Sequence, residues 1–193
     1  MTCVIGYIDK AKNKLYMGAD SMMSTENMKM YVNIDNQKVF QNGDFIFGVC
    51  GSPRMMSLLR YSLVVPERTI HQLDVDYMNT DFIENVRALF VNAGFGGLDV
   101  NNTQTGGVFL VAYNGKIYRV DSDYQVLLID DDYISIGSGS EYALGALSAL
   151  EHTKMKTADK IELALLCSAR YNPYVGGNNY IMEVPTWMKL LVN

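Results

Sequence analysis

The sequence is poor in the residues that form disulfide bridges and metal sites. It contains three cysteines and two histidines in 193 residues. Cys3, Cys50 and Cys167 are odd in number, lie far apart and include no C-x-x-C pair, so they predict buried small apolar residues in a reducing compartment. His71 and His152 stand alone, without the short spacing of metal ligands. We therefore expect no metal centre and no cofactor.

Positive charge and long apolar runs are also scarce. The chain has 16 Lys and Arg residues against 21 Asp and Glu, which gives a net charge of -5. This charge does not favour binding to nucleic acid or to an anionic membrane surface. No stretch approaches the roughly 20 apolar residues of a membrane span. The first ten residues include Asp9 and Lys10 and no long apolar run, which argues against a signal peptide. The sequence thus predicts a soluble cytoplasmic protein.

What the sequence does contain is typical of a globular protein, with 49% hydrophobic and 19% charged residues. The length suits a single domain over residues 1–193. Apolar alternation predicts strands and apolar 3–4 spacing predicts helices. The expected strands cover 2–8, 14–20, 30–34, 37–40, 44–51, 106–121, 124–129, 133–137 and 178–184, and the expected helices cover 51–65, 79–94, 139–152 and 157–170. This order of strand and helix blocks predicts packed sheets covered by helices, an α+β layered domain.

Three local signals fix ends of these elements. Ser52 followed by Pro53 is typical of a helix start, and Thr80 or Asp81 is the expected cap of the second helix. The pair Asn114-Gly115 lies between two alternating apolar runs and predicts a tight type I′ hairpin.

Polar residues near the start of the chain are candidates for chemistry. Thr2 follows the initiator methionine, Asp20 ends the strand "KLYMGAD", and Lys38 lies in "NQKVF". By its spacing alone, the Asp20 and Lys38 pair is best interpreted as a surface ion pair worth roughly 0–1 kcal/mol. Cys3 is a second nucleophile in principle, but it lacks the terminal amine that would act as its base.

Three glycine-containing turns favour a functional site over a surface ion pair. They are "GVCGSP", "IGSGSEYALGAL" and "NPYVGGNNY", and each alone indicates only a turn or a helix cap. Taken in order with Thr2, "GADS" and "QKVF", they make a chain that resembles a proteasome β-type subunit over nearly its whole length. The bacterial HslV protease belongs to the same superfamily, and "GSGSEYALG" is the most specific stretch of the resemblance. The short segment before Thr2 is more similar to HslV than to a typical β-subunit precursor.

The resemblance implies a fold and an activity. The fold is a four-layer αββα sandwich, the N-terminal-nucleophile (Ntn) hydrolase fold. The activity is that of a threonine-type peptidase in a self-compartmentalising oligomer. Thr2 would become the terminal nucleophile once Met1 is removed, and its freed α-amine, with a reference pKa of ~8, would be its base near neutral pH.

The same resemblance implies roles for four further residues. Lys38 would favour the neutral amine, and Asp20 would hold Lys38. The backbone N–H of Gly51 would face the oxyanion. Ser138 would hydrogen-bond near the terminal amine.

One segment departs from the family pattern. Asn172 and Val175 stand where the family commonly has Asp and Ser, both of which help to organise the terminal amine. Two alternatives therefore stay open beside the peptidase. One is a catalytically silent protein of the same fold that acts by assembly or binding, and the other is a small-molecule Ntn amidase.

The resemblance also implies partners. It implies a peptide or unfolded protein as substrate and a homo-oligomeric ring. It allows an ATP-driven unfoldase as a partner, although no residue identifies a docking surface for one. Specificity pockets would lie around 21–23, 33–37 and 50–54, and the stretches "SMMS" and "CGSPRM" indicate an apolar pocket.

Overall fold

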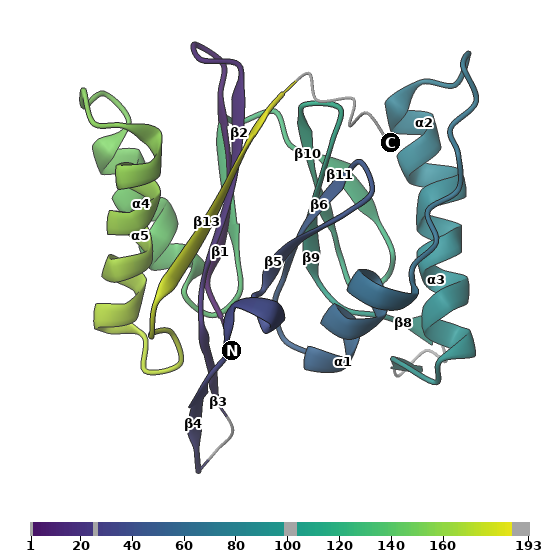
Figure 1. The fold of residues 1–193 in the computed structure, drawn as a ribbon, viewed down its shortest axis with the longest axis horizontal. Coiled ribbons are helices and arrows are strands. Elements are labelled where there is room, and N and C mark those ends of the chain that lie inside the picture. The colour runs from purple at the N-terminus through teal and green to yellow at the C-terminus, as the bar shows by residue number, and fades with distance from the viewer. Residues whose placement is uncertain (1, 25–26, 99–103, 187–193) are drawn as a thin grey trace.

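The computed structural model describes residues 2–24, 27–98 and 104–186. Two antiparallel sheets lie face to face, and helices cover the outer face of each (Figure 1). The first sheet has the order β12 (Tyr133–Ile136), β1 (Val4–Asp9), β2 (Lys14–Asp20), β13 (Asn179–Pro185). The second has the order β11 (Val126–Leu128), β10 (Lys116–Val120), β9 (Phe109–Tyr113), β6 (Phe45–Val49), β5 (Val39–Asn42).

The helices form the two outer layers, as Figure 1 shows. The first sheet is covered by α4 (Ser140–Leu150) and α5 (Thr157–Tyr171). The second is covered by two helical segments, of which the first ends in a turn of π-helix and the second contains one in its middle. These are α1 (Pro53–Ser57) with η2 (Leu58–Ser62), and α2 (Asp74–Tyr77) with η3 (Met78–Phe82) and α3 (Ile83–Asn92). Short elements complete the fold: β3 (Met22–Ser24), β4 (Lys29–Tyr31), η1 (Ile34–Asn36), β7 (Gly97–Leu98) and β8 (Gln104–Thr105).

Three apolar clusters separate the four layers. Ile5, for example, packs with α4 and α5, whereas its neighbour Val4 packs between the two sheets. This follows from strand geometry, because successive side chains point to opposite faces. The third cluster lies between the second sheet and the helices α1 to α3, with Phe47 and Phe82 fully buried in it. The predicted four-layer αββα sandwich is therefore confirmed.

The local predictions had mixed outcomes. Ser52 caps α1 by accepting a hydrogen bond from the Met55 backbone N at 3.4 Å. Asn114 and Gly115 have φ of 49° and 73°, the left-handed pair that a type I′ hairpin requires. The predicted helix start at Thr80 or Asp81 is wrong. The helical segment already begins with α2 at Asp74, because the apolar residues just before Thr80 are buried in the core. The predicted strand 30–34 is also shorter, since β4 ends at Tyr31.

The two sheets approach each other closely at Gly48 in β6. A Cβ at this position would lie 2.5 Å from Cγ1 of Val4 and 2.9 Å from Sδ of Met17. Only glycine allows this approach without a shift of the neighbouring side chains. It brings the end of β6 next to the start of β1, where the site described below is found.

Candidate active site

Four strand ends meet at one end of the sandwich. In the first sheet Val4 pairs with Ala19, so Thr2 before β1 lies beside Asp20 at the end of β2. In the second sheet Val39 pairs with Gly48, so Lys38 before β5 lies beside the segment that follows β6. The structure therefore brings together residues that are far apart in the sequence.

Asp20 is fully buried and accepts four hydrogen bonds. Its Oδ1 accepts from the Lys38 Nζ at 2.8 Å and from the Cys3 backbone N at 3.0 Å. Its Oδ2 accepts from the backbone N of Met22 at 3.2 Å and of Gly176 at 3.1 Å. Asp20 thus joins β1, β2, the segment before β5 and the glycine turn before β13.

Lys38 is 3% exposed, so the expected surface ion pair is a buried one. Its Nζ donates to Oδ1 of Asp20 and, at 2.5 Å, to the Met22 carbonyl. Burial lowers the pKa of the Lys38 ammonium, and the Asp20 charge opposes that shift. The result is a desolvated cation held rigidly beside Thr2.

Thr2 is 4% exposed and is held through its backbone. Its N donates to Ser138 Oγ at 3.3 Å, and its carbonyl accepts from the Gly139 N at 3.2 Å. Gly137 has φ of +95°, and a Cβ there would lie 2.2 Å from the Thr2 carbonyl oxygen. The turn between β12 and α4 therefore fits against Thr2 only with glycine at that position. Met1 lies outside the described residues.

Asn172 and Val175 lie behind this turn, after α5. Asn172 Nδ2 donates to the Ser138 carbonyl at 2.6 Å, and its Oδ1 accepts from the Tyr174 N at 2.9 Å. Val175 is 4% exposed and belongs to the apolar cluster under α4 and α5. All seven residues identified from the sequence therefore lie in one region, although Val175 contributes packing rather than a polar contact.

A pocket of about 180 Å³ opens beside Thr2. Gly51 lies in its wall with φ of +88°, and a Cβ there would meet no atom of the described residues within 4 Å. The rest of the wall is largely apolar and consists of Met23, Ser24, Met30, Lys38, Val49, Cys50, Ser52, Pro53 and Met56. The predicted stretches 21–23 and 50–54 contribute to this wall, and 33–37 does not.

The cysteines of the region are unsuited to be nucleophiles. Burial raises the pKa of the Cys50 thiol to about 11. Cys3 is fully buried, and burial raises the pKa of its thiol too. Its Sγ lies 3.5 Å from Ser168 Oγ and 3.6 Å from Ser135 Oγ. Thiols with a raised pKa are inert at neutral pH.

Sequence reasoning missed Ser168. This residue of α5 is fully buried, and its single O–H is shared between the Gly139 carbonyl at 2.9 Å and the Ala164 carbonyl at 3.0 Å. A serine among the apolar residues of a helix was the available signal, because such a hydroxyl needs a partner.

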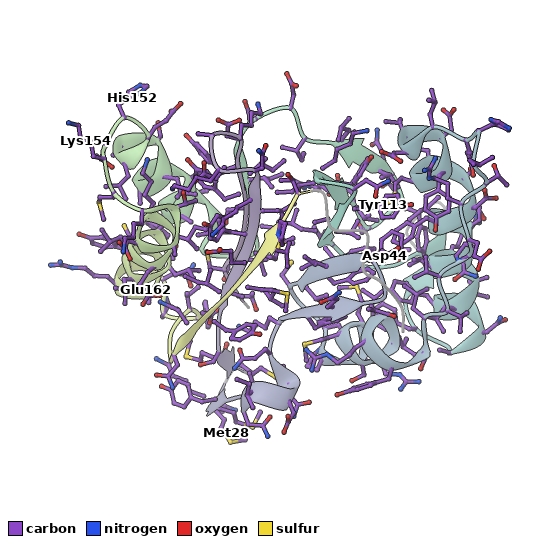
Figure 2. The ribbon with its side chains drawn as sticks, turned by 45° about the horizontal axis from the view of Figure 1, so that its top comes forward. Met28, Asp44, Tyr113, His152, Lys154 and Glu162 are labelled. Atoms are coloured by element: carbon purple, nitrogen blue, oxygen red, sulfur yellow. The ribbon has the colours of Figure 1, made fainter. Side chains whose placement is uncertain are left out.

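The described residues contain no metal-binding cluster and no helix that could span a membrane. No group of three His, Cys, Asp or Glu side chains among them could hold a metal ion. His152 lies near the connection between α4 and α5, far from the hairpin end marked by Met28 (Figure 2).

None of the helices in these ranges has the length and apolar character needed to cross a membrane.

Comparison with solved structures gives strong likenesses at low sequence identity. The chain is similar to BPH of Thiobacillus denitrificans in complex with epoxomicin, with a TM-score of 0.76, 16% identity and coverage of 96% of this chain and 99% of that one. It is similar to HslV of Trypanosoma brucei, with a TM-score of 0.64, 15% identity and coverage of 94% of this chain and 98% of that one. It is also similar to Anbu of Yersinia bercovieri, with a TM-score of 0.64, 16% identity and coverage of 96% of this chain and 82% of that one. No protein-family model matches the sequence.

These likenesses establish the fold. The chain has the α+β sandwich of the HslV-like Ntn hydrolases, as the order of its sequence motifs predicted. At 14–18% identity these likenesses show the fold and not an activity.

Proposed function

We propose that this chain is a threonine-type N-terminal-nucleophile peptidase, a single domain over residues 1–193 with Thr2 as nucleophile. The observation that carries the proposal is the buried Lys38–Asp20 pair beside Thr2 at the mouth of an apolar pocket. A buried ion pair gains little stability over apolar packing, so its presence at a pocket favours a functional role.

The chemistry follows from the groups at hand. After removal of Met1, Thr2 Oγ1 attacks the scissile carbonyl carbon, and the Thr2 α-amine accepts the hydroxyl proton. The Gly51 N–H faces the oxyanion that forms. The C–N bond then breaks, and the amine fragment leaves with the proton from the Thr2 ammonium. Water, deprotonated by the same amine, hydrolyses the ester and regenerates the threonine.

Lys38 keeps the amine in its neutral form, ready to accept a proton, at the start of the reaction. Its positive charge disfavours a second cation nearby, so it keeps the α-amine neutral and stabilises negative charge on the hydroxyl oxygen. Asp20 keeps the lysine in place through Oδ1 while its other oxygen is bound to backbone N–H groups.

Two alternative functions remain beside the peptidase, and one of them has a specific observation in its favour. A silent assembly protein is favoured by the loss of the family carboxylate and hydroxyl at Asn172 and Val175. A small-molecule amidase is compatible with the same nucleophile. The open pocket beside Thr2, walled by several methionines, favours a peptide side chain over a small polar amide.

The proposal includes a cytoplasmic homo-oligomeric ring that takes peptides or unfolded protein, with an ATP-driven unfoldase as its partner. Exposed apolar residues on the outer face of α4 and α5, Leu144, Leu163, Leu166 and Tyr171, support assembly.

Intact mass before and after treatment with a peptide epoxyketone tests the proposal, because this reagent joins the hydroxyl and the amine of a terminal threonine. BPH of the same fold was solved in complex with epoxomicin, a compound of this class. We expect a starting mass without methionine and a single adduct. Thr2→Ala should give no adduct and no peptide hydrolysis, and Thr153→Ala, a change at an exposed helix connection, should leave both intact. Retained methionine without an adduct would favour the silent protein.

A further inference from the structure

Asn172 uses both ends of its carboxamide. The Tyr174 backbone N lies 2.9 Å away and can only donate, so the amide oxygen faces it. The Ser138 carbonyl oxygen lies 2.6 Å from the other end and can only accept, so the NH₂ group faces it. The orientation of the side chain is therefore fixed by its two partners, and its bond to Ser138 is a donated one.

Two adjacent carbonyls of the same turn are held from α5. Asn172 binds the carbonyl of Ser138, and Ser168 Oγ binds the carbonyl of Gly139 at 2.9 Å. The opposite side of the turn faces Thr2, through Ser138 Oγ and the Gly139 N. The end of α5 thus sets the position of the groups that contact Thr2.

Val175 packs against the other side of this turn. A Cβ on Gly139 would lie 2.9 Å from Val175 Cγ2 and 2.9 Å from the Cys3 Cβ, so apolar packing already closes the space behind the turn. With that side sealed, Asn172 is the polar side chain on the half-exposed side of the turn.

We propose that Asn172 is a positioning residue that acts by donating a hydrogen bond to the Ser138 carbonyl, and that a carboxylate at this position would impair the site. This inference rests on the proposed function. Aspartate would still accept from the Tyr174 N, but it would place a negative oxygen against the Ser138 carbonyl oxygen. Asn172→Asp therefore removes one bond of the pair and adds a repulsion, so restoring the family's usual residue should be harmful in this chain.

The test compares Asn172→Asp and Asn172→Leu with the unchanged protein, using two readouts. The first is backbone hydrogen exchange at Gly139 and Ser140, whose N–H groups are bonded within the turn and to Thr2. We expect exchange to accelerate roughly tenfold in Asn172→Asp. The second is peptide hydrolysis, where we expect kcat to fall roughly tenfold with KM nearly unchanged, because the pocket is untouched.

The order of the variants decides the question. The proposal requires activity to fall from Asn to Leu to Asp. Activity of Asn172→Asp at or above that of the unchanged protein, or unchanged exchange at the turn, would overturn it. Asn178→Asp adds the same charge at an exposed position six residues further on and should change neither readout. If the unchanged protein hydrolyses nothing and forms no epoxyketone adduct, the proposed function fails, and the exchange readout still decides whether Asn172 locks the turn.

Discussion

Asp20 connects four donors from separate parts of the chain, and only one of them is charged. Lys38 supplies the charge, and the backbone N–H groups of Cys3, Met22 and Gly176 supply the rest. Each of these donors would lose its partner if the carboxylate were removed, at a cost beyond that of the ion pair. Asp20 should therefore contribute more to stability than its pairing with Lys38 alone.

Replacing Asp20 tests this directly. Asp20→Asn places an NH₂ group against N–H donors and removes the charged partner of Lys38, so we expect a loss of about 3 kcal/mol in the free energy of unfolding. Lys38→Met should cost less, because the backbone N–H groups remain on Asp20. Urea unfolding measures both values.

An exposed pair provides the control. Lys10 Nζ lies 2.7 Å from Asp132 Oδ1, with side chains 67% and 46% exposed. Asp132→Asn should cost less than about 1 kcal/mol. If Asp20→Asn costs no more than Asp132→Asn, the network around Asp20 does not stabilise the fold.

The same residues show what spacing along the chain can and cannot predict. Spacing favoured a surface ion pair for Asp20 and Lys38, and both residues are buried. Burial here depends on contacts such as that of Asp20 with the turn at Gly176, which lies far away in the sequence. The resemblance placed both residues in one site, because it carries information about these distant contacts.

Among the elements, the turn between β12 and α4 fits closely against Thr2. Gly137 combines φ of +95° with a distance of 2.2 Å from an added Cβ to the Thr2 carbonyl oxygen. Alanine cannot adopt this backbone conformation without strain and would push Thr2 out of place.

Gly137→Ala should therefore destabilise the protein by about 2 kcal/mol or more and abolish the epoxyketone adduct. Gly145→Ala is the matched control. It lies in α4, and an added Cβ meets no atom of the described residues within 4 Å. Alanine there should raise the free energy of unfolding by about 0.5–1 kcal/mol. Thermal unfolding and intact mass check both variants, and a normal adduct in Gly137→Ala would show that the turn does not set the position of Thr2.

Element ends were predictable where local chemistry decides them. Ser52-Pro53 and Asn114-Gly115 are such cases, because a cap and a left-handed turn depend on adjacent residues. The start of the second helix was not predictable from its cap residues. Tyr77 and Met78 are buried against the second sheet, and this packing extends the helical segment toward the N-terminus, to residues before Thr80.

At the scale of the whole molecule, the pocket beside Thr2 is built by three separate parts of the fold. The hairpin of β3 and β4 contributes Met23 and Met30, the end of β6 contributes Val49, and α1 contributes Met56. The sequence predicted an apolar pocket, and it could not predict Met30, because the hairpin turns this residue toward the strand ends of both sheets. Lys38, the one charged residue that the described part of the chain contributes to the wall, is paired with Asp20.

The wall predicts the substrate preference of the proposed peptidase. We expect cleavage after leucine or phenylalanine to exceed cleavage after arginine by roughly tenfold or more in kcat/KM, because a charged side chain would lose hydration among methionines. Met30→Glu should shift this preference toward arginine, since it adds a negative charge to the wall at a position that is 45% exposed and tolerates it. Fluorogenic peptides that differ only in the residue before the scissile bond measure the ratio.

Met28 is the matched control for this charge. It lies at the end of the same hairpin (Figure 2), is 55% exposed and is not part of the pocket wall. Met28→Glu adds the same charge to the hairpin, so it should leave the preference unchanged if the wall itself selects the side chain. An equal shift in both variants would mean that the charge acts at long range on the encounter with substrate, and added salt would then abolish it. A preference that responds only to Met30→Glu, and persists in salt, would assign the selection to the pocket beside Thr2.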